Sequence, residues 1–139
     1  MGTDIRPELS KKNKYWLEKH RYYELKHFCL QYPIWKKAYL ALTDLSGRPL
    51  DIQVISKSYA ISDPTRRIAE ARLFYENRMK MVENTAEQTD KDLCGYILIA
   101  VTQGKSYDSL RTNYNIPCCR DVYYQLYRKF FSLLSEERE

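Results

Sequence analysis

Residues 91–136 read KDLCGYILIAVTQGKSYDSLRTNYNIPCCRDVYYQLYRKFFSLLSE, and this stretch decides the fold. Its apolar residues return every three or four positions, which is the spacing of helices that bury one face. Asp90 can cap a first helix over 91–103, and Gly104 can end that helix in the left-handed conformation. Because period-2 alternation is almost absent from the whole chain, we predict an all-α protein in which long N-terminal helices pack with a C-terminal three-helix unit.

Two more helices are predicted after this glycine. Ser106 can cap a short helix that ends near Tyr114, and a final helix should run from about Cys119 to Glu136. Between them the chain turns at Asn-Ile-Pro, residues 115–117. The middle helix is short and the last one is basic and aromatic, which is the plan of a helix-turn-helix DNA reader.

The last helix is expected to bury an aliphatic stripe. The predicted contacts join Leu110 and Ile116 to Val122 and Leu126, and the stripe continues through Leu133 and Leu134. In the usual helix-turn-helix, an apolar residue stands five positions after the apolar residue of the turn, whereas Val122 follows Ile116 by six. We therefore expect a longer turn, which leaves the docking of the last helix open by part of a helical turn.

Side chains on or beside the opposite face are candidates for contact with double-stranded DNA. They are Lys105, Arg111, Arg120, Tyr124, Gln125, Arg128 and Lys129. Arginine can bond guanine through two hydrogen bonds and glutamine can do so with adenine, whereas lysine suits the phosphates. The alternative is that three helices simply pack together and that this charged face is only hydrated.

The rest of the chain also reads mainly as helix. One helix is predicted over 11–32, a second from Pro33 to about Leu45, and a third, capped by Asp63, from Pro64 to about Thr89. The predicted division is an aromatic-rich helical region over 1–48, a linker over 49–63, a long connecting helix over 64–89 and a helix-turn-helix domain over 90–139.

Aromatic and basic residues are interleaved in the first forty positions. Two apolar faces on the helix over 11–32 indicate two packing partners, and Tyr and Trp are enriched at interface hot spots. The candidates for a protein interface are Tyr15, Trp16, Tyr23 and Trp35. The alternative is that both faces pack inside the chain. The lysines and arginines between the aromatic residues could form a second nucleic-acid surface or a hydrated helix face.

Composition excludes several classes of protein. The chain has 139 residues, a formal charge of +5 and no apolar run of the ~20 residues that a membrane span needs. The polar N-terminus carries no secretory signal, so we expect a cytoplasmic protein with reduced cysteines. No metal or cofactor is expected, because His20 and His27 are too far apart to share an ion and no CxxC pair occurs. The sequence has no recognisable motif that pairs a nucleophile with a neighbouring base, so we do not expect an enzyme.

Two stretches of sequence carry a resemblance to a known family. Within residues 14–36 the matching segments are Lys-Tyr-Trp-Leu, Leu-Lys-His-Phe-Cys and Tyr-Pro-Ile-Trp-Lys. Within residues 96–131 they are Tyr-Ile-Leu, Gly-Lys-Ser-Tyr-Asp-Ser-Leu, Asn-Ile-Pro-Cys-Cys-Arg-Asp-Val-Tyr-Tyr and Tyr-Arg-Lys-Phe-Phe. These stretches resemble late-operon transcriptional regulators of the RinA and ArpU type, from phages and prophages of Gram-positive bacteria. The C-terminal part is similar to the region-four helix-turn-helix of sigma factors.

The resemblance implies a sequence-specific DNA-binding regulator that acts on phage promoter or operator DNA in the cytoplasm of the bacterial host and performs no chemistry. Its partners would be double-stranded DNA and other copies of itself, with a dimer favoured, while host RNA polymerase or another host protein stays open as a further partner. Two alternatives are a phage protein that binds and inhibits or redirects a host protein machine, and a DNA-packaging subunit with a helix-turn-helix.

Overall fold

The computed structural model describes residues 13–46 and 62–139, and all regular structure in these two ranges is helical. The helices are α1 (Lys19–Leu30), α2 (Tyr32–Ser46), α4 (Ser62–Thr89), α5 (Cys94–Gln103), α6 (Tyr107–Tyr114) and α7 (Arg120–Glu137). The prediction of an all-α protein is therefore confirmed. The predicted linker over 49–63 lies outside the described residues, except for its last two positions, which begin α4.

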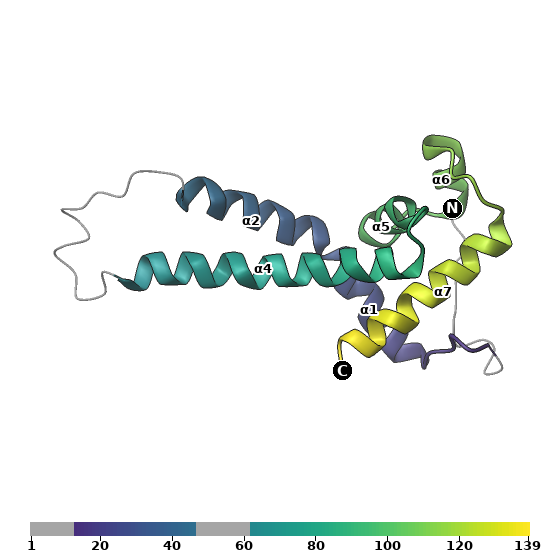
Figure 1. Cartoon of the computed structure of the whole chain (residues 1–139), viewed down its shortest axis with the longest axis horizontal. Coiled ribbons are helices and arrows are strands. Elements are labelled where there is room, and N and C mark those ends of the chain that lie inside the picture. The colour runs from purple at the N-terminus through teal and green to yellow at the C-terminus, as the bar shows by residue number, and fades with distance from the viewer. Residues whose placement is uncertain (1–12, 47–61) are drawn as a thin grey trace.

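Two parts of the molecule differ in shape (Figure 1). In the first, which we call the arm (residues 32–46 and 62–78), α2 packs antiparallel along the first part of α4. In the second, which we call the head (residues 13–31 and 79–139), α5 and α7 pack against the last turns of α4, α1 packs against α5 and α7, and α6 packs against α5. The part of the arm farther from the head consists of these two helices with no third described helix beside them.

Helix α1 begins later than the sequence predicted, at Lys19 in place of a start at residue 11. The carboxylate of Glu18 sets this boundary, because it accepts backbone N–H bonds from His20 at 2.8 Å and from Arg21 at 3.1 Å. These bonds satisfy donors that the first turn of a helix leaves without an internal partner. Glutamate is not among the usual capping residues, which is why sequence reasoning missed this start.

The joint between α1 and α2 is as short as predicted. Gln31 donates its backbone N–H to the Phe28 carbonyl at 3.2 Å, and its own carbonyl accepts the Ile34 N–H at 2.9 Å. Pro33 is the second residue of α2. Its missing N–H costs little there, because N–H groups in the first turn have no partner inside the helix.

Helix α4 runs from Ser62 to Thr89, so it begins two residues before the predicted first position, Pro64, and ends where predicted. The residues it buries toward the head are Met79, Val82, Thr85, Ala86 and Thr89. The two threonine hydroxyls each donate to the carbonyl four residues earlier at 2.7 Å, so their burial leaves no unsatisfied donor. On the exposed side two ion pairs join residues four positions apart: Arg66–Glu70 at 3.1 Å and Glu76–Lys80 at 2.8 Å.

The core of the head is aromatic, and helices from both ends of the chain contribute to it. The Tyr22 hydroxyl of α1 lies 2.9 Å from the Tyr127 hydroxyl of α7, and the Tyr22 ring meets the edge of Phe131 at 5.3 Å. Aromatic pairs of this kind add about 0.5–1.5 kcal/mol to the free energy of burial. Residues 90–139, which the sequence sets apart as a domain, thus share one core with the N-terminal helices.

Candidate nucleic-acid interface

The joint between α5 and α6 follows the sequence prediction closely. Gly104 has φ +67° and donates its N–H to the Ala100 carbonyl, so the left-handed end of α5 is confirmed. The Ser106 hydroxyl accepts the Ser109 N–H at 3.2 Å and caps α6 as predicted. The start of α5 differs: Asp90 accepts backbone N–H bonds from two later residues, but the helix itself begins at Cys94.

The turn between α6 and α7 spans residues 115–119 and is held at both ends. Asn115 takes the left-handed conformation with φ +53°, which asparagine tolerates better than most residues. Ile116 is buried under it and donates its N–H to the Leu110 carbonyl at 3.3 Å. The Tyr107 hydroxyl donates to the Cys118 carbonyl at 2.6 Å, which ties the far end of the turn to the start of α6.

The buried face of α7 differs from the predicted one. Leu110, Ile116 and Leu134 are buried as expected, but Val122 is 46% exposed, and Tyr123 and Tyr127 occupy the core in its place. Leu126 and Leu133 are only half-buried. Each residue turns a helix by about 100°, so the shift from Val122 to Tyr123 rotates the whole helix by roughly that angle. The aliphatic stripe was therefore the wrong choice of buried face.

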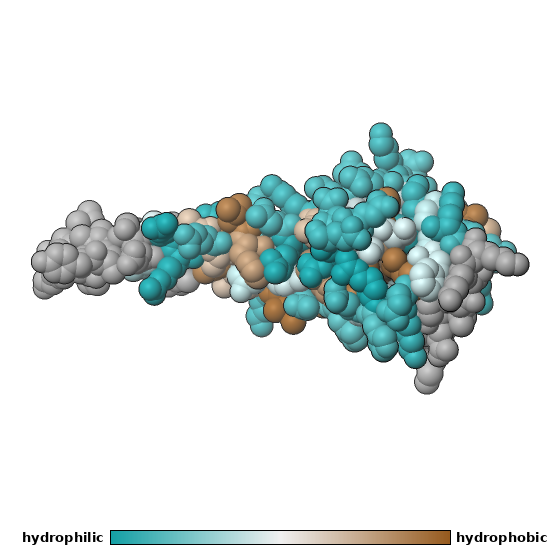
Figure 2. Space-filling model, turned by 90° about the horizontal axis from the view of Figure 1, so that it is seen from below, coloured by the Kyte–Doolittle hydropathy of each residue, from teal (hydrophilic) through white to brown (hydrophobic). Residues whose placement is uncertain are grey.

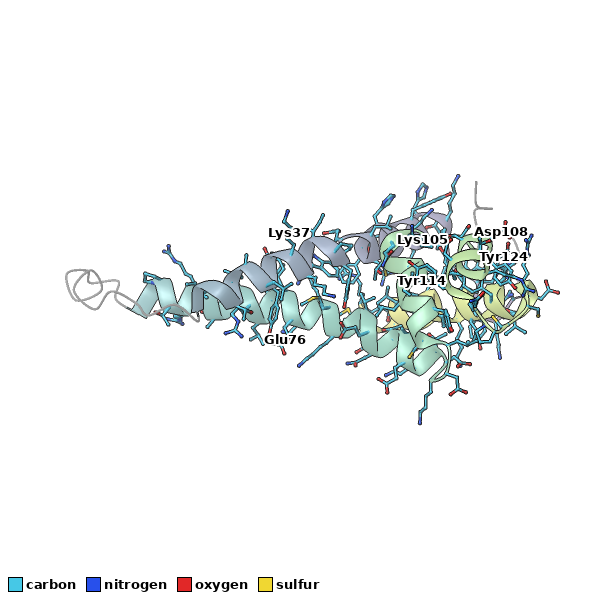
Figure 3. The ribbon with its side chains drawn as sticks, turned by 90° about the horizontal axis from the view of Figure 1, so that it is seen from above. Lys37, Glu76, Lys105, Asp108, Tyr114 and Tyr124 are labelled. Carbon is cyan, nitrogen blue, oxygen red and sulfur yellow. The ribbon has the colours of Figure 1, made fainter. Side chains whose placement is uncertain are left out.

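The side chains of Arg120 and Tyr124 both make contacts within the chain. The Arg120 guanidinium bonds the Asp108 carboxylate of α6 at 2.6 Å and lies 5.6 Å from the centre of the Tyr107 ring. Tyr124 is half-buried, and its ring lies 5.9 Å from that of Tyr123. Figure 3 shows Tyr124 and Asp108 at the same end of the head.

The other predicted DNA contacts keep more exposure. Gln125 on α7 and Arg111 on α6 are exposed, whereas Arg128, Lys129 and Lys105 are half-exposed. Three of these side chains lie on α7, and Lys105 lies in the joint before α6, which Figure 3 places at the head. The side chains of this set are thus polar, and most of them are basic.

Two acidic residues on this face were missed by the sequence reasoning. Asp108 lies in the first turn of α6 and Asp121 in the first turn of α7, and both are exposed. A signal was available, because acidic residues are favoured in the first turn of a helix by its dipole. The pairing of Asp108 with Arg120 could not be foreseen, since it depends on the angle between α6 and α7.

The predicted protein interface is only partly at the surface. Tyr15, Trp16 and Tyr23 are half-buried. Trp35 is 4% exposed, with its ring 4.8 Å from that of Phe28, so it belongs to the core and cannot serve as an interface residue. The strongly exposed apolar side chains lie elsewhere, and the arm holds four of them: Ile34, Leu40, Leu73 and Phe74. Figure 2 shows hydrophobic side chains gathered on the arm among hydrophilic ones.

The chain offers little for redox or metal chemistry in the part that the structure describes. All four cysteines are free thiols, and burial raises the pKa of Cys29 and of Cys118, which makes both thiols less reactive. Within residues 13–46 and 62–139 no three His, Cys, Asp or Glu side chains gather as a metal site would require. None of the described helices combines the length and the apolar character needed to cross a membrane.

Comparison of the chain with protein-family models, with curated proteins and with solved structures finds no match.

Proposed function

We propose that this protein binds double-stranded DNA in a sequence-specific manner and regulates transcription, as the resemblance to phage and prophage regulators implies. The observation that carries the proposal is the pair α6 and α7. A turn with Ile116 buried inside joins them, and the middle of α7 carries Gln125, which is exposed, with Arg128 and Lys129, which are half-exposed. A single α-helix fits the major groove of B-DNA, which is about 12 Å wide.

The side chains divide into two roles under this proposal. Gln125 and Arg128 lie on α7 and carry the groups that can make paired hydrogen bonds to adenine and guanine. Lys105 lies in the α5–α6 joint and Arg111 lies on α6, and under this proposal both would meet phosphates and fix the orientation of the head. DNA contact of this kind needs no cofactor and involves no covalent step.

The first experiment is selection of duplexes from a random pool, followed by anisotropy titration of the selected duplex. We expect Arg128→Ala and Gln125→Ala each to weaken binding by about 1–3 kcal/mol, the usual value of a paired base contact. Matched controls are Arg67→Ala and Gln88→Ala, because both residues are exposed and lie on α4, outside the α6–α7 pair. Equal affinities in all four variants would contradict this placement of the DNA.

The salt dependence of the same titration provides a second test. Each phosphate that a lysine or arginine neutralises releases counterions, so the affinity should fall steeply as salt rises. Lys105→Gln and Arg111→Gln should each reduce the slope by about 1 on a log–log plot and weaken binding to all sequences alike. An affinity that does not change with salt would exclude contact with nucleic acid phosphates.

The arm favours a second role, contact with another protein. Ile34 and Leu40 of α2 and Leu73 and Phe74 of α4 are exposed, and large apolar side chains at a surface are often covered by a partner. The partner could be a second copy, as expected for a dimeric DNA reader, or a host protein. Measurement of the mass in solution identifies a second copy, and capture from a host lysate treated with nuclease identifies a host protein that does not depend on DNA.

A further inference from the structure

The ion pair between Asp108 and Arg120 lies within the candidate interface and joins its two helices. Asp108 is in the first turn of α6, Arg120 is the first residue of α7, and their oxygen and nitrogen atoms are 2.6 Å apart. Both side chains remain largely exposed, at 67% and 52%. An exposed pair of this kind contributes only about 0–1 kcal/mol to folding, so its role in stability is small.

The ion pair leaves some N–H donors of Arg120 available for another acceptor. A guanidinium has five N–H donors in one plane, and one nitrogen of Arg120, Nη2, bonds the Asp108 carboxylate. The ring of Tyr107 lies 5.6 Å from the guanidinium carbon and limits movement on that side. In the structure Arg120 is thus oriented by Asp108 and bounded by the Tyr107 ring, while its other N–H groups can still reach an acceptor. Fixing such a side chain on binding ordinarily costs about 0.5–1.5 kcal/mol.

The carboxylate of Asp108, unlike the guanidinium of Arg120, would repel the phosphates of DNA. Asp108 carries a negative charge at an exposed position of a surface that would face DNA, where it repels the backbone whatever the base sequence. Asp121, in the first turn of α7, is also exposed and has no ion pair within the described residues. The two aspartates therefore share the repulsion, but only Asp108 orients an arginine.

We propose that Asp108 is a positioning residue for DNA recognition, which holds Arg120 ready for a base acceptor and weakens binding to DNA that lacks one. The inference rests on the proposed function, because it assumes that the α6–α7 face meets the duplex. Asp108 would thus lower the affinity for all DNA and still contribute to the preference for the correct sequence. Neutralising that residue should therefore make binding stronger and less selective.

The experiment compares two short duplexes, the one that the wild-type protein selects from a random pool and a shuffled duplex of equal composition. Affinities are measured for the wild type, Asp108→Asn, Asp121→Asn, Arg120→Gln and the Asp108→Asn/Arg120→Gln double variant. Asparagine preserves the size of the side chain and removes its charge. Circular dichroism and the thermal midpoint of unfolding establish that each variant is folded.

We expect Asp121→Asn to strengthen binding to both duplexes alike, because it removes only repulsion. Asp108→Asn should strengthen binding to the shuffled duplex more, so that the ratio of the two affinities falls at least about threefold. In the Arg120→Gln background the same substitution should leave that ratio unchanged, since the residue it orients is absent.

Two results would overturn the inference while leaving DNA binding intact. One is an equal change of the ratio in Asp108→Asn and Asp121→Asn, which would reduce Asp108 to a general charge. The other is a fall of the ratio that persists without Arg120, which would mean that Asp108 acts through another group. If the wild-type protein shows no preference for its selected duplex, the proposed function fails, and the inference fails with it.

Discussion

In the head, apolar helix faces are covered by helices from both ends of the chain, whereas in the arm α2 and α4 pack mainly on each other and only the start of α2 also meets the head, through Trp35 and Phe28. The head therefore buries residues such as Tyr22, Phe130 and Leu134 completely. Among the described side chains of the arm only Trp35 is buried, while Ile68 and Tyr75 of α4 are half-buried and Leu73 and Phe74 are exposed. The difference shows where a substitution should act: on folding in the head, and on contacts with other molecules in the arm.

The largest effect should come from the core of the head. Phe130 is fully buried on α7, so Phe130→Ala should lower the free energy of unfolding by about 3–5 kcal/mol through lost burial and a cavity. Urea denaturation followed by circular dichroism measures the change. The matched substitution in the arm is Phe74→Ala, where the exposed ring should cost far less. Similar losses in the two variants would remove the distinction between head and arm.

A smaller effect should come from the backbone between α5 and α6. Gly104→Ala forces a side chain into the left-handed conformation, which costs roughly 1–2 kcal/mol, and the nearest atom to the new Cβ, at 3.5 Å, adds no clash. Gly95→Ala is the control, because Gly95 lies inside α5 with open space around it. That variant should gain about 0.5–1 kcal/mol. Destabilisation in both would contradict the assigned conformations, and thermal unfolding measures each.

The junction of arm and head should respond to alkaline pH. Burial, together with the hydrogen bond that Tyr32 of α2 donates to Glu83 of α4, raises the pKa of Tyr32. The folded state therefore keeps this proton longer than the unfolded chain, in which tyrosine titrates near pH 10. The resulting contribution to stability is complete below about pH 10 and is lost as the pH rises further.

Tyr32→Phe tests this contribution directly. The variant should lose about 1 kcal/mol of stability at pH 8 with the hydrogen bond, and should then lose less than the wild type between pH 8 and pH 11. Burial also raises the pKa of Tyr123 in the head, so some alkaline loss should remain in the variant. Tyr114→Phe, at an exposed position, is the control and should follow the wild type. An unchanged pH response in Tyr32→Phe would refute the assignment.

The smallest effect on folding should come from the exposed apolar surface of the arm. Leu73→Ser should change the free energy of unfolding by less than about 0.5 kcal/mol, as surface substitutions usually do. If the arm joins two copies, the same variant should lower the mass measured by sedimentation. A large loss of stability at a concentration where the protein is monomeric would mean that Leu73 is covered within the chain.

The accuracy of the sequence predictions follows the range of the interactions behind them. The left-handed end at Gly104 and the cap at Ser106 were foreseen because each depends on bonds within five residues. The buried face of α7 was not, because the helix carries an aliphatic stripe and an aromatic stripe side by side. Hydropathy favours the aliphatic one, yet Tyr127 can be buried because its hydroxyl finds that of Tyr22.

The candidate interface was foreseen as a list of residues and not as an arrangement. Gln125 and Arg111 are exposed as the sequence reasoning assumed, whereas Arg120 bonds an aspartate that this reasoning overlooked. Trp35 was predicted at a protein interface because tryptophan is common there, but in the structure it packs against Phe28 in the core. A helix wheel gives the angle of each side chain about its own axis and says nothing of which side another helix will cover.

The sequence by itself determined the helical class, most helix boundaries and the tight joints around α6, because local hydrogen bonds and apolar spacing specify them. Only the tertiary structure decided which face of α7 is inside and that Asp108 meets Arg120. These features depend on the angles between helices and on partners such as Tyr22 and Tyr127, which are 105 residues apart in the chain. Contacts over that separation form only when the whole head is assembled.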